Sequence, residues 1–299
     1  MKTVDIKGII PPIITPMFAD ESINFEVLAQ QVDRLIVNGI HALFCFGTNG
    51  EGYILNGKEK KAVLEAVIEA ADHRVPIYAG TGCISTKESI EQSQMAQAAG
   101  ADVLSIITPS FAAASQEELY VHYKAIAESV DIPIVLYNIP ARTGNKLAPE
   151  TVHRLSQIPN IVGVKDSSGN WDNMVAYLEN AKGSDFAVLS GNDSLILNCL
   201  KNGGKGGIAG CANVYPQTMT GIYNSFVSGD LEKAQMYQDS IASFRACFKY
   251  GNPNTIVKAA VAMLGYDVGP CRAPFNQIPE EGIAALRNVL EENAARGMR

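Results

Sequence analysis

Short apolar runs rich in β-branched residues alternate along this chain with longer segments whose apolar positions recur at helical spacing. The alternation is typical of repeated βα units, in which strands buried on both faces read as nearly continuous apolar runs. Eight strands are predicted, beginning at Gly8, Ala42, Val75, Val103, Ile132, Ile161, Phe186 and Gly206. A predicted helix follows each strand, over residues 24–38, 58–72, 86–99, 116–129, 149–157, 171–180, 194–201 and 216–226.

Eight repeats favour an α/β fold in which parallel strands close into a (β/α)8 TIM barrel, with an open doubly wound sheet as the alternative. Helical spacing continues after the eighth unit, over residues 230–248, 253–264 and 280–295, and glycines and prolines separate these segments. We therefore expect a barrel catalytic domain over residues 1–226 and a C-terminal helical region over residues 227–299.

Composition and charge argue against nucleic-acid binding, a membrane span and a metal site. The chain has 31 acidic and 24 basic residues and a net charge of −7, without long runs of one sign, so nucleic acid is not an expected partner. The N-terminal apolar stretch is broken by prolines, and no other run reaches the length of a membrane span, so a cytoplasmic protein without membrane contact is expected. The six cysteines show no metal-ligand spacing, which predicts free thiols and no metal site.

Catalytic residues are expected where the strands end, because active sites of parallel barrels lie at the C-terminal ends of their strands. Polar residues stand there after the second, fifth, sixth and seventh strands, over residues 47–51, 137–138, 165–168 and 190–193. The four histidines lie on predicted helices or at their ends and are expected to be structural or surface residues.

Lys165 is the sharpest of these signals, because it interrupts the apolar run 161–164. Desolvation lowers the pKa of a lysine and makes its amine available as a nucleophile toward a carbonyl. An ion pair with Asp166 or another nearby carboxylate explains the position equally well. Tyr137 also interrupts a strand, and its phenol either transfers protons to a bound imine or packs in the barrel as a structural residue.

Three further features fit a binding role or a structural one. The loop 47–51 offers backbone N–H groups between glycines and the Thr48 hydroxyl, which suit a carboxylate but also a tight turn. Arg142, just past the fifth strand, is placed to bind a substrate carboxylate or to remain solvated. The glycine-rich segment 203–207 precedes the eighth strand, so a tight entry into that strand is favoured over phosphate binding.

In this order and spacing, the motifs resemble the dihydrodipicolinate synthase and N-acetylneuraminate lyase superfamily of pyruvate-dependent class I aldolases. The matching segments cover nearly the whole chain and are residues 8–12 (GIIPP), 47–51 (GTNGE), 137–140 (YNIP), 163–166 (GVKD), 189–193 (LSGND) and 212–214 (ANV). The resemblance implies that Lys165 forms a Schiff base with pyruvate and that Tyr137 is the acid/base residue beside it. It further implies that Thr48 and Asn49 hold the pyruvate carboxylate.

The same resemblance places Gly191 and Ile208 against the bound pyruvate and Arg142 in the loop with which the synthases handle a dicarboxylate. It implies a homotetramer built as a dimer of dimers. It also implies that no metal or organic cofactor is needed, because the lysine imine serves as the electron sink.

Several positions depart from the synthase pattern and affect the choice of second substrate. Synthases usually carry two tyrosines after the Thr-Pro that ends strand four, the second completing a proton relay in a neighbouring subunit, whereas this chain has Ser110 and Phe111. Asn49 stands where synthases usually have a second threonine. This variant of the loop, together with the segment 269–274, resembles the 4-hydroxy-2-oxoglutarate aldolases of the same superfamily. Gly57 and Lys60 replace the histidines of lysine-inhibited members, so lysine feedback is not expected.

We therefore expect a carbon–carbon lyase in which the Lys165 amine attacks C2 of pyruvate and the resulting enamine adds to, or leaves, an aldehyde. The reaction is either condensation with aspartate semialdehyde, in the manner of the synthases, or cleavage or dehydration of a 4-hydroxy-2-oxo or 2-oxo-3-deoxy acid. The alternative from a different class is a non-catalytic barrel that binds a 2-oxo acid or a sugar acid.

Overall fold

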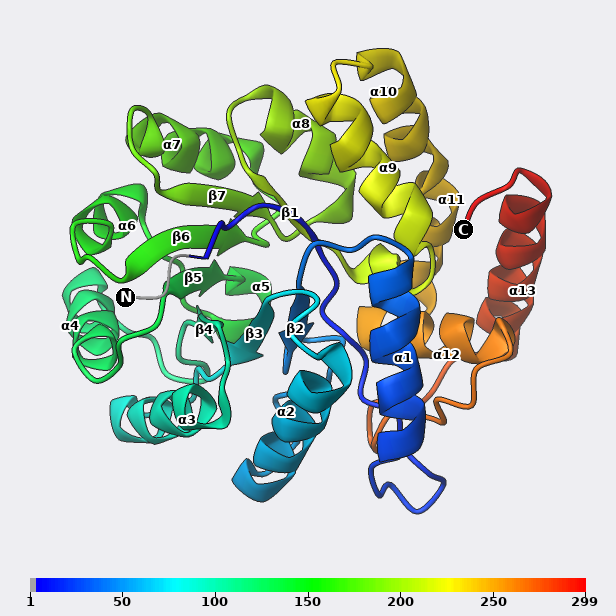
Figure 1. The fold of residues 1–299 in the computed structure, drawn as a ribbon, viewed down its shortest axis with the longest axis horizontal. Coiled ribbons are helices and arrows are strands. Elements are labelled where there is room, and N and C mark those ends of the chain that lie inside the picture. Colours follow the sequence, from blue (N-terminus) through cyan, green and yellow to red (C-terminus); the bar gives the residue numbers. More distant parts are fainter. Residues whose placement is uncertain (1–3) are drawn as a thin grey trace. The chain divides into compact units, whose positions relative to one another are not determined.

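The computed structural model describes residues 4–299, and the predicted alternation of strands and helices is present along it (Figure 1). The chain divides into two compact units, each assembled from segments distant in the sequence. The first unit contains residues 4–8 together with Pro76–Ile208, and the second contains Ile9–Val75 together with Ala209–Arg299. The expected boundary at residue 226 stays a prediction.

Six parallel strands form the centre of the first unit, and each pairs with the next one in the chain. They are β3 (Ile77–Gly80), β4 (Val103–Ile107), β5 (Ile134–Asn138), β6 (Ile161–Asp166), β7 (Ala187–Ser190) and β8 (Gly206–Ile208). The connecting helices are α3 (Thr86–Ala99), α4 (Gln116–Ala127), α5 (Pro140–Thr143), α6 (Pro149–Leu155), α7 (Trp171–Ala181) and α8 (Ile196–Lys201), with the 3-10 turn η1 (Asp193–Leu195) before α8. Figure 1 shows α3, α4, α6 and α7 along the outside of these strands.

Local sequence signals explain where these helices begin and end. The Ser115 hydroxyl accepts the backbone N–H of Glu118, whose carboxylate in turn accepts the Ser115 N–H, and this capping box fixes the start of α4. Ser85 caps α3 with its side chain, and Gly100 ends that helix with a φ of 101° that a side chain would disfavour. The strands stay buried on both faces, as their continuous apolar runs predict.

The second unit combines the N-terminal βα elements with the C-terminal helices. It holds Ile9 and Ile10 of β1 (Gly8–Ile10), then α1 (Phe25–Val37), β2 (Leu43–Cys45) and α2 (Gly57–Ala71). After residue 208 come η2 (Gly210–Asn213), α9 (Pro216–Val227), α10 (Leu231–Ser240), α11 (Ala242–Ala246), η3 (Cys247–Tyr250), α12 (Pro253–Met263) and α13 (Glu280–Ala295). Helices α1 and α2 lie side by side (Figure 1).

Several element boundaries differ from the prediction, and three of the differences change the elements themselves. The helix expected over 230–248 is broken after Ser240, whose hydroxyl donates to the Tyr237 carbonyl and competes with the helical hydrogen bonds. The unpredicted helix α5 begins with Pro140 at its first position and ends at Gly144, which has a φ of 78°. The eighth strand ends at Ile208, and the rest of its predicted run forms η2.

All six cysteines carry free thiols, as predicted; five are buried and Cys83 is half-buried. Among residues 4–299, no helix combines the length and the apolar character that a membrane crossing requires.

Candidate active site

Lys165 and Tyr137 lie next to each other near the C-terminal ends of β6 and β5. The parallel register pairs Tyr137 directly with Lys165, and paired residues of neighbouring strands point to the same face. The Lys165 Nζ lies 3.7 Å from the centre of the Tyr137 ring, and Lys165 is only 4% exposed. The structure therefore brings together the two residues to which the sequence assigned the central chemistry.

Asp166, the carboxylate nearest to Lys165 in the sequence, belongs to the opposite face of the strand. Its Oδ1 accepts a hydrogen bond of 2.8 Å from the Asn138 side-chain amide, and its Oδ2 accepts one of 2.8 Å from the Ser168 hydroxyl. The Asn138 Oδ1 in turn accepts the Leu147 N–H at 3.0 Å. Asp166 thus fixes the end of β6 and the loop that follows. Its two carboxylate oxygens bond to Asn138 and Ser168 and not to the Lys165 amine.

Burial is the main influence on the Lys165 amine. Desolvation lowers the pKa of Lys165 below its ordinary value of 10.5, because the charged ammonium is disfavoured away from water. Tyr137, through charge and hydrogen bonding, and the Asp193 carboxylate act in the opposite direction. A lowered pKa makes the neutral, nucleophilic amine available at a lower pH than in an exposed lysine.

Gly191 leaves the space that the Lys165 side chain occupies. A Cβ on residue 191 would lie 2.8 Å from the Lys165 Cε and 1.9 Å from the Ser167 Oγ, so a larger residue would displace one or both. The Gly191 N–H donates to the Asp166 carbonyl at 2.8 Å, which fixes its position after β7. Ile208, the last residue of β8, is buried. Sequence reasoning assigned no role to Ser167, which only tertiary packing places against Gly191.

Arg142 lies in α5, immediately after β5, and its side chain is exposed. The helix around it is anchored by its neighbour Thr143, whose hydroxyl accepts a hydrogen bond of 2.8 Å from the Thr108 hydroxyl at the end of β4. The scaffold that carries Arg142 is therefore held in place, whereas the guanidinium itself faces solvent. Its role toward a substrate stays a prediction.

The loop after β4 presents Phe111 to solvent. Phe111 is 98% exposed and has a φ of 78°, an unusual backbone conformation for an aromatic residue. Asn145 holds this loop in place: its side-chain amide donates to the carbonyls of Pro109 at 2.9 Å and Ala112 at 2.7 Å, and its Oδ1 accepts the Ala114 N–H at 2.8 Å. The exposed Phe111 ring therefore lies on a turn whose backbone is held by hydrogen bonds.

In the second unit, the loop 47–51 follows β2 and is tightly packed. A Cβ on Gly50 would lie 2.7 Å from the Ile13 carbonyl, and the buried Thr15 hydroxyl donates to the Gly50 carbonyl at 2.8 Å. Between the glycines, Asn49 is buried and Thr48 is half-buried. The backbone of both predicted carboxylate-binding residues is therefore set by close contacts.

Glu51 ends this loop and is completely buried, with a φ of 55°. Its Oε1 accepts a hydrogen bond of 2.8 Å from the Lys258 Nζ, and its Oε2 accepts one of 2.8 Å from the Arg272 N–H. Sequence reasoning gave neither Glu51 nor Lys258 a role. A signal existed, because Lys258 interrupts an apolar stretch of its helix as Lys165 interrupts one in its strand.

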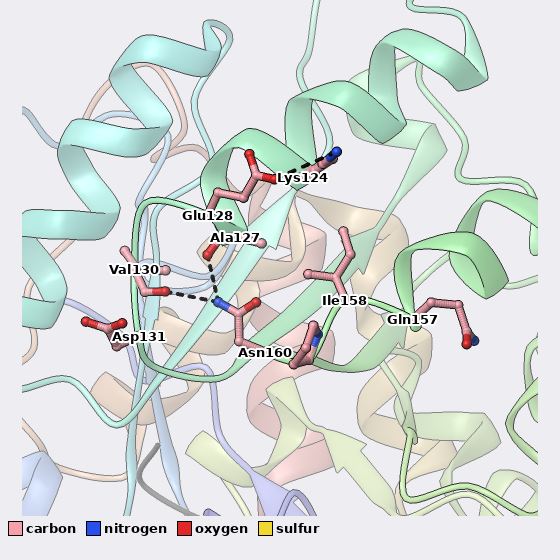
Figure 2. Close-up of a pocket in the computed structure, with 9 residues that line it drawn as sticks. Lys124, Ala127, Glu128, Val130, Asp131, Gln157, Ile158 and Asn160 are labelled. Atoms are coloured by element: carbon pink, nitrogen blue, oxygen red, sulfur yellow. Dashed lines mark hydrogen bonds and ion pairs between the residues drawn. The ribbon is translucent and has the colours of Figure 1, made fainter.

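A surface hollow of about 480 Å³ lies away from this chemistry, at the opposite ends of β5 and β6 (Figure 2). It is lined by residues that end α4 or precede the two strands: Lys124, Ala127, Glu128, Val130, Asp131, Gln157, Ile158, Pro159 and Asn160. Asn160 donates to the carbonyls of Ala127 at 2.8 Å and Val130 at 3.1 Å, so it closes the end of α4. Because barrel active sites lie at the C-terminal strand ends, this hollow is not the candidate site.

Comparisons with known proteins identify the family to which this chain is similar. The profile of the dihydrodipicolinate synthetase family matches residues 5–293. The 4-hydroxy-tetrahydrodipicolinate synthase of Methanothrix thermoacetophila is 41% identical over 285 residues, which cover 95% of this chain and 96% of that protein.

Two solved structures in complex with pyruvate are also similar to this chain. The chloride-inhibited dihydrodipicolinate synthase of Acinetobacter baumannii has a TM-score of 0.93 at 35% identity, covering 97% of this chain and 99% of its own. YagE, a prophage protein of the dihydrodipicolinic acid synthase family from E. coli K12, has a TM-score of 0.93 at 33% identity, with coverage of 97% and 99%. The predicted (β/α)8 barrel with C-terminal helices is confirmed.

Proposed function

The chain belongs to the dihydrodipicolinate synthetase family, and we propose that it acts through an imine between Lys165 and pyruvate. Enzymes of this family are carbon–carbon lyases of the pyruvate-dependent aldolase type. The observation that carries the assignment to this lysine is its burial against the Tyr137 ring, with a lowered pKa, at the C-terminal end of a barrel strand.

The proposed reaction begins when the lone pair of the Lys165 Nζ adds to C2 of pyruvate and gives a carbinolamine. Loss of water then gives the iminium, and loss of a proton from C3 gives the enamine, because the iminium accepts the electron pair of the broken C–H bond. The nucleophilic C3 adds to the carbonyl carbon of an aldehyde. Hydrolysis of the new iminium releases the product and restores the amine.

Tyr137 is placed to move the protons of these steps. Its ring lies 3.7 Å from the Lys165 Nζ, so the phenol is held beside the nitrogen that becomes the imine. A general acid at this position protonates the departing hydroxide of the carbinolamine and recovers a proton when the imine is hydrolysed. Thr48 is proposed as its partner in proton transfer.

The remaining predicted residues are proposed to bind the substrates. Thr48 and Asn49 would hold the pyruvate carboxylate with side-chain and backbone donors of the loop 47–51. Gly191 and Ile208 would lie against the pyruvate, since a side chain at residue 191 would meet Lys165. Arg142 would bind a carboxylate of the second substrate with its planar fork.

The imine itself would replace an external cofactor, because protonated nitrogen supplies the electron sink that the reaction needs. The proposed partners are pyruvate and an aldehyde, without nucleic acid or membrane, and the proposed assembly is a homotetramer in the cytoplasm. The pyruvate complexes of the A. baumannii synthase and YagE support the first substrate.

Phe111 favours a second candidate reaction within the same chemistry. A phenylalanine cannot carry a proton, so the relay that synthases complete at this position lacks its hydroxyl. In that case the enzyme would cleave or dehydrate a 4-hydroxy-2-oxo or 2-oxo-3-deoxy acid rather than condense pyruvate with aspartate semialdehyde. The fixed, exposed turn around Phe111 makes the difference testable by one substitution.

Borohydride reduction in the presence of pyruvate tests the imine. The expected result is a stoichiometric mass increase on the Lys165 peptide, absent without pyruvate. No label on a folded protein would reject the imine and support the non-catalytic, 2-oxo-acid-binding alternative if pyruvate still bound in calorimetry. A panel of aldehydes with pyruvate, and of 4-hydroxy-2-oxo acids assayed for pyruvate release, then separates condensation from cleavage.

A further inference from the structure

Glu51 occupies a position that the backbone alone would give to glycine. Its φ of 55° lies in the left-handed region, where a side chain is strained, and its carboxylate is completely buried. The flanking residues Gly50 and Gly52 are glycines without room for a Cβ. A charged residue in such a place incurs both backbone strain and desolvation, which implies that its carboxylate serves a need that glycine cannot meet.

The contacts of the Glu51 carboxylate run to two segments far away in the sequence. Oε1 accepts from the Lys258 Nζ, at 2.8 Å, on helix α12, and Lys258 is itself only 1% exposed. Oε2 accepts the backbone N–H of Arg272 at 2.8 Å. The end of the loop 47–51 is therefore tied at two points to the C-terminal part of the second unit.

The Arg272 side chain extends this link to the start of α2. Its guanidinium donates to the Glu59 carboxylate at 2.7 Å and 3.2 Å, and to the carbonyl of Glu21 at 2.8 Å. Glu59 belongs to the capping box that Asn56 begins at the N-terminus of α2. The chain on both sides of Glu51 is thus fixed, with the loop between β2 and α2 anchored at its centre.

We propose that the buried Glu51–Lys258 pair is a positioning device that sets the backbone of Thr48 and Asn49 for binding the pyruvate carboxylate. The proposal rests on the proposed function and adds residues that touch no substrate. Its physical basis is that the Glu51 N–H donates to the Thr48 carbonyl at 3.2 Å, so a shift of Glu51 moves the turn that contains both residues. Binding of a carboxylate by backbone donors is sensitive to such shifts.

The test measures the pyruvate concentration that gives half-maximal borohydride labelling of Lys165. In Glu51→Gln and Lys258→Met, we expect this concentration to rise about tenfold to a hundredfold, with the label at saturating pyruvate unchanged. The matched control is Val257→Ala, which removes fully buried packing next to Lys258 but keeps the ion pair. It should lower the thermal midpoint without changing the half-saturating concentration.

The double variant Glu51→Gln/Lys258→Met separates positioning from stability and is also the fallback if a single variant fails to fold. It leaves no unpaired buried charge, and the introduced glutamine can still accept the Arg272 N–H through its amide oxygen, so the thermal midpoint should recover. The link to α12 is lost, so half-saturation should stay raised. Recovery of both properties together, or unchanged half-saturation in the single variants, would overturn the proposal.

Failure of the proposed function has a different signature. If wild-type protein gave no label, the imine would be rejected, and hydrogen exchange over residues 46–52 would decide the positioning role by itself. Faster exchange of these amides in Glu51→Gln and Lys258→Met, but not in Val257→Ala, supports the role. Equal exchange in all three variants contradicts it.

Discussion

Two of the buried lysines in this protein, Lys165 and Lys258, have different surroundings, which fit the proposed reactive role of the first and a structural role of the second. Lys258 lies on a helix and donates to the Glu51 carboxylate at 2.8 Å, which ties two segments of the chain together. Lys165 lies on a strand against the Tyr137 ring, and burial lowers its pKa. Lys165 and Lys258 are 4% and 1% exposed, so burial alone does not distinguish the two lysines.

An apolar run interrupted by lysine therefore identifies a buried amine but not its role. A carboxylate at hydrogen-bonding distance compensates the cost of burying charge, and the result is an anchor. An aromatic face compensates the cost of burying charge less than a carboxylate does, so the neutral form of the amine is more readily populated. Asp166 does not act as such a carboxylate for Lys165, because its oxygens accept hydrogen bonds from Asn138 and Ser168 on the other face of β6.

Removing the amine of Lys165 should have the largest effect, and removing that of Lys258 a different one. Lys165→Ala should abolish labelling by borohydride with pyruvate and reduce turnover by about a thousandfold or more, because the covalent route is lost. Lys258→Met should still be labelled at saturating pyruvate. Mass spectrometry of the labelled peptides checks both, and a label on Lys258 in the wild-type protein would contradict the division of roles.

Removing only the phenol hydroxyl of Tyr137 separates the contribution of the ring from that of proton transfer. In Tyr137→Phe the ring stays against Lys165, so imine formation should continue, while turnover falls about a hundredfold to ten-thousandfold through loss of proton transfer. Steady-state rates and single-turnover labelling measure the two effects separately. Turnover equal to that of the wild-type protein would show that another group transfers the proton.

The pH dependence provides a smaller but direct measure of the Lys165 environment. Because folding lowers its pKa below 10.5, the unfolded chain binds the proton first as the pH falls. The contribution of neutral Lys165 to stability is full above 10.5 and is lost as the pH falls through the folded-state pKa. Lys165→Met should remove this loss, measured as a flatter dependence of the free energy of unfolding on pH.

The same pH series has a kinetic control. The rate of labelling in the wild-type protein should show its inflection below 10.5, where an exposed lysine would be protonated and slow. An inflection at the ordinary value would mean that Lys165 is solvated in the working enzyme, and the contrast with Lys258 would then fail.

The smallest effect is expected from Phe111→Tyr, which tests the half of the site that neither lysine determines. Phe111 is 98% exposed, so the free energy of unfolding should change by less than about 0.5 kcal/mol. Labelling by pyruvate should be unchanged, while condensation with aspartate semialdehyde should rise a few fold if the missing hydroxyl limits it. Unchanged condensation would show that the second substrate is selected elsewhere.

Much of the fold could be read from the sequence because local signals and the global fold agree. The cap residues Asn56 and Ser115 set helix starts within a residue of those predicted, and α3 and α13 have the predicted bounds. The break after Ser240 escaped prediction, because a side-chain hydrogen bond within an apolar-periodic segment leaves the period unchanged.

The sequence alone predicts the eight-fold alternation, places the candidate chemistry at the strand ends, and identifies Lys165 and Tyr137 as residues that interrupt strands. These features follow from short-range periodicity and from single residue types out of place. The contact of Tyr137 with Lys165, the bonding of Asp166 to Asn138, and the pairing of Glu51 with Lys258 are visible in the tertiary structure alone. Such pairings join residues up to 207 positions apart, and strand register and helix packing, which no local pattern encodes, bring them into contact.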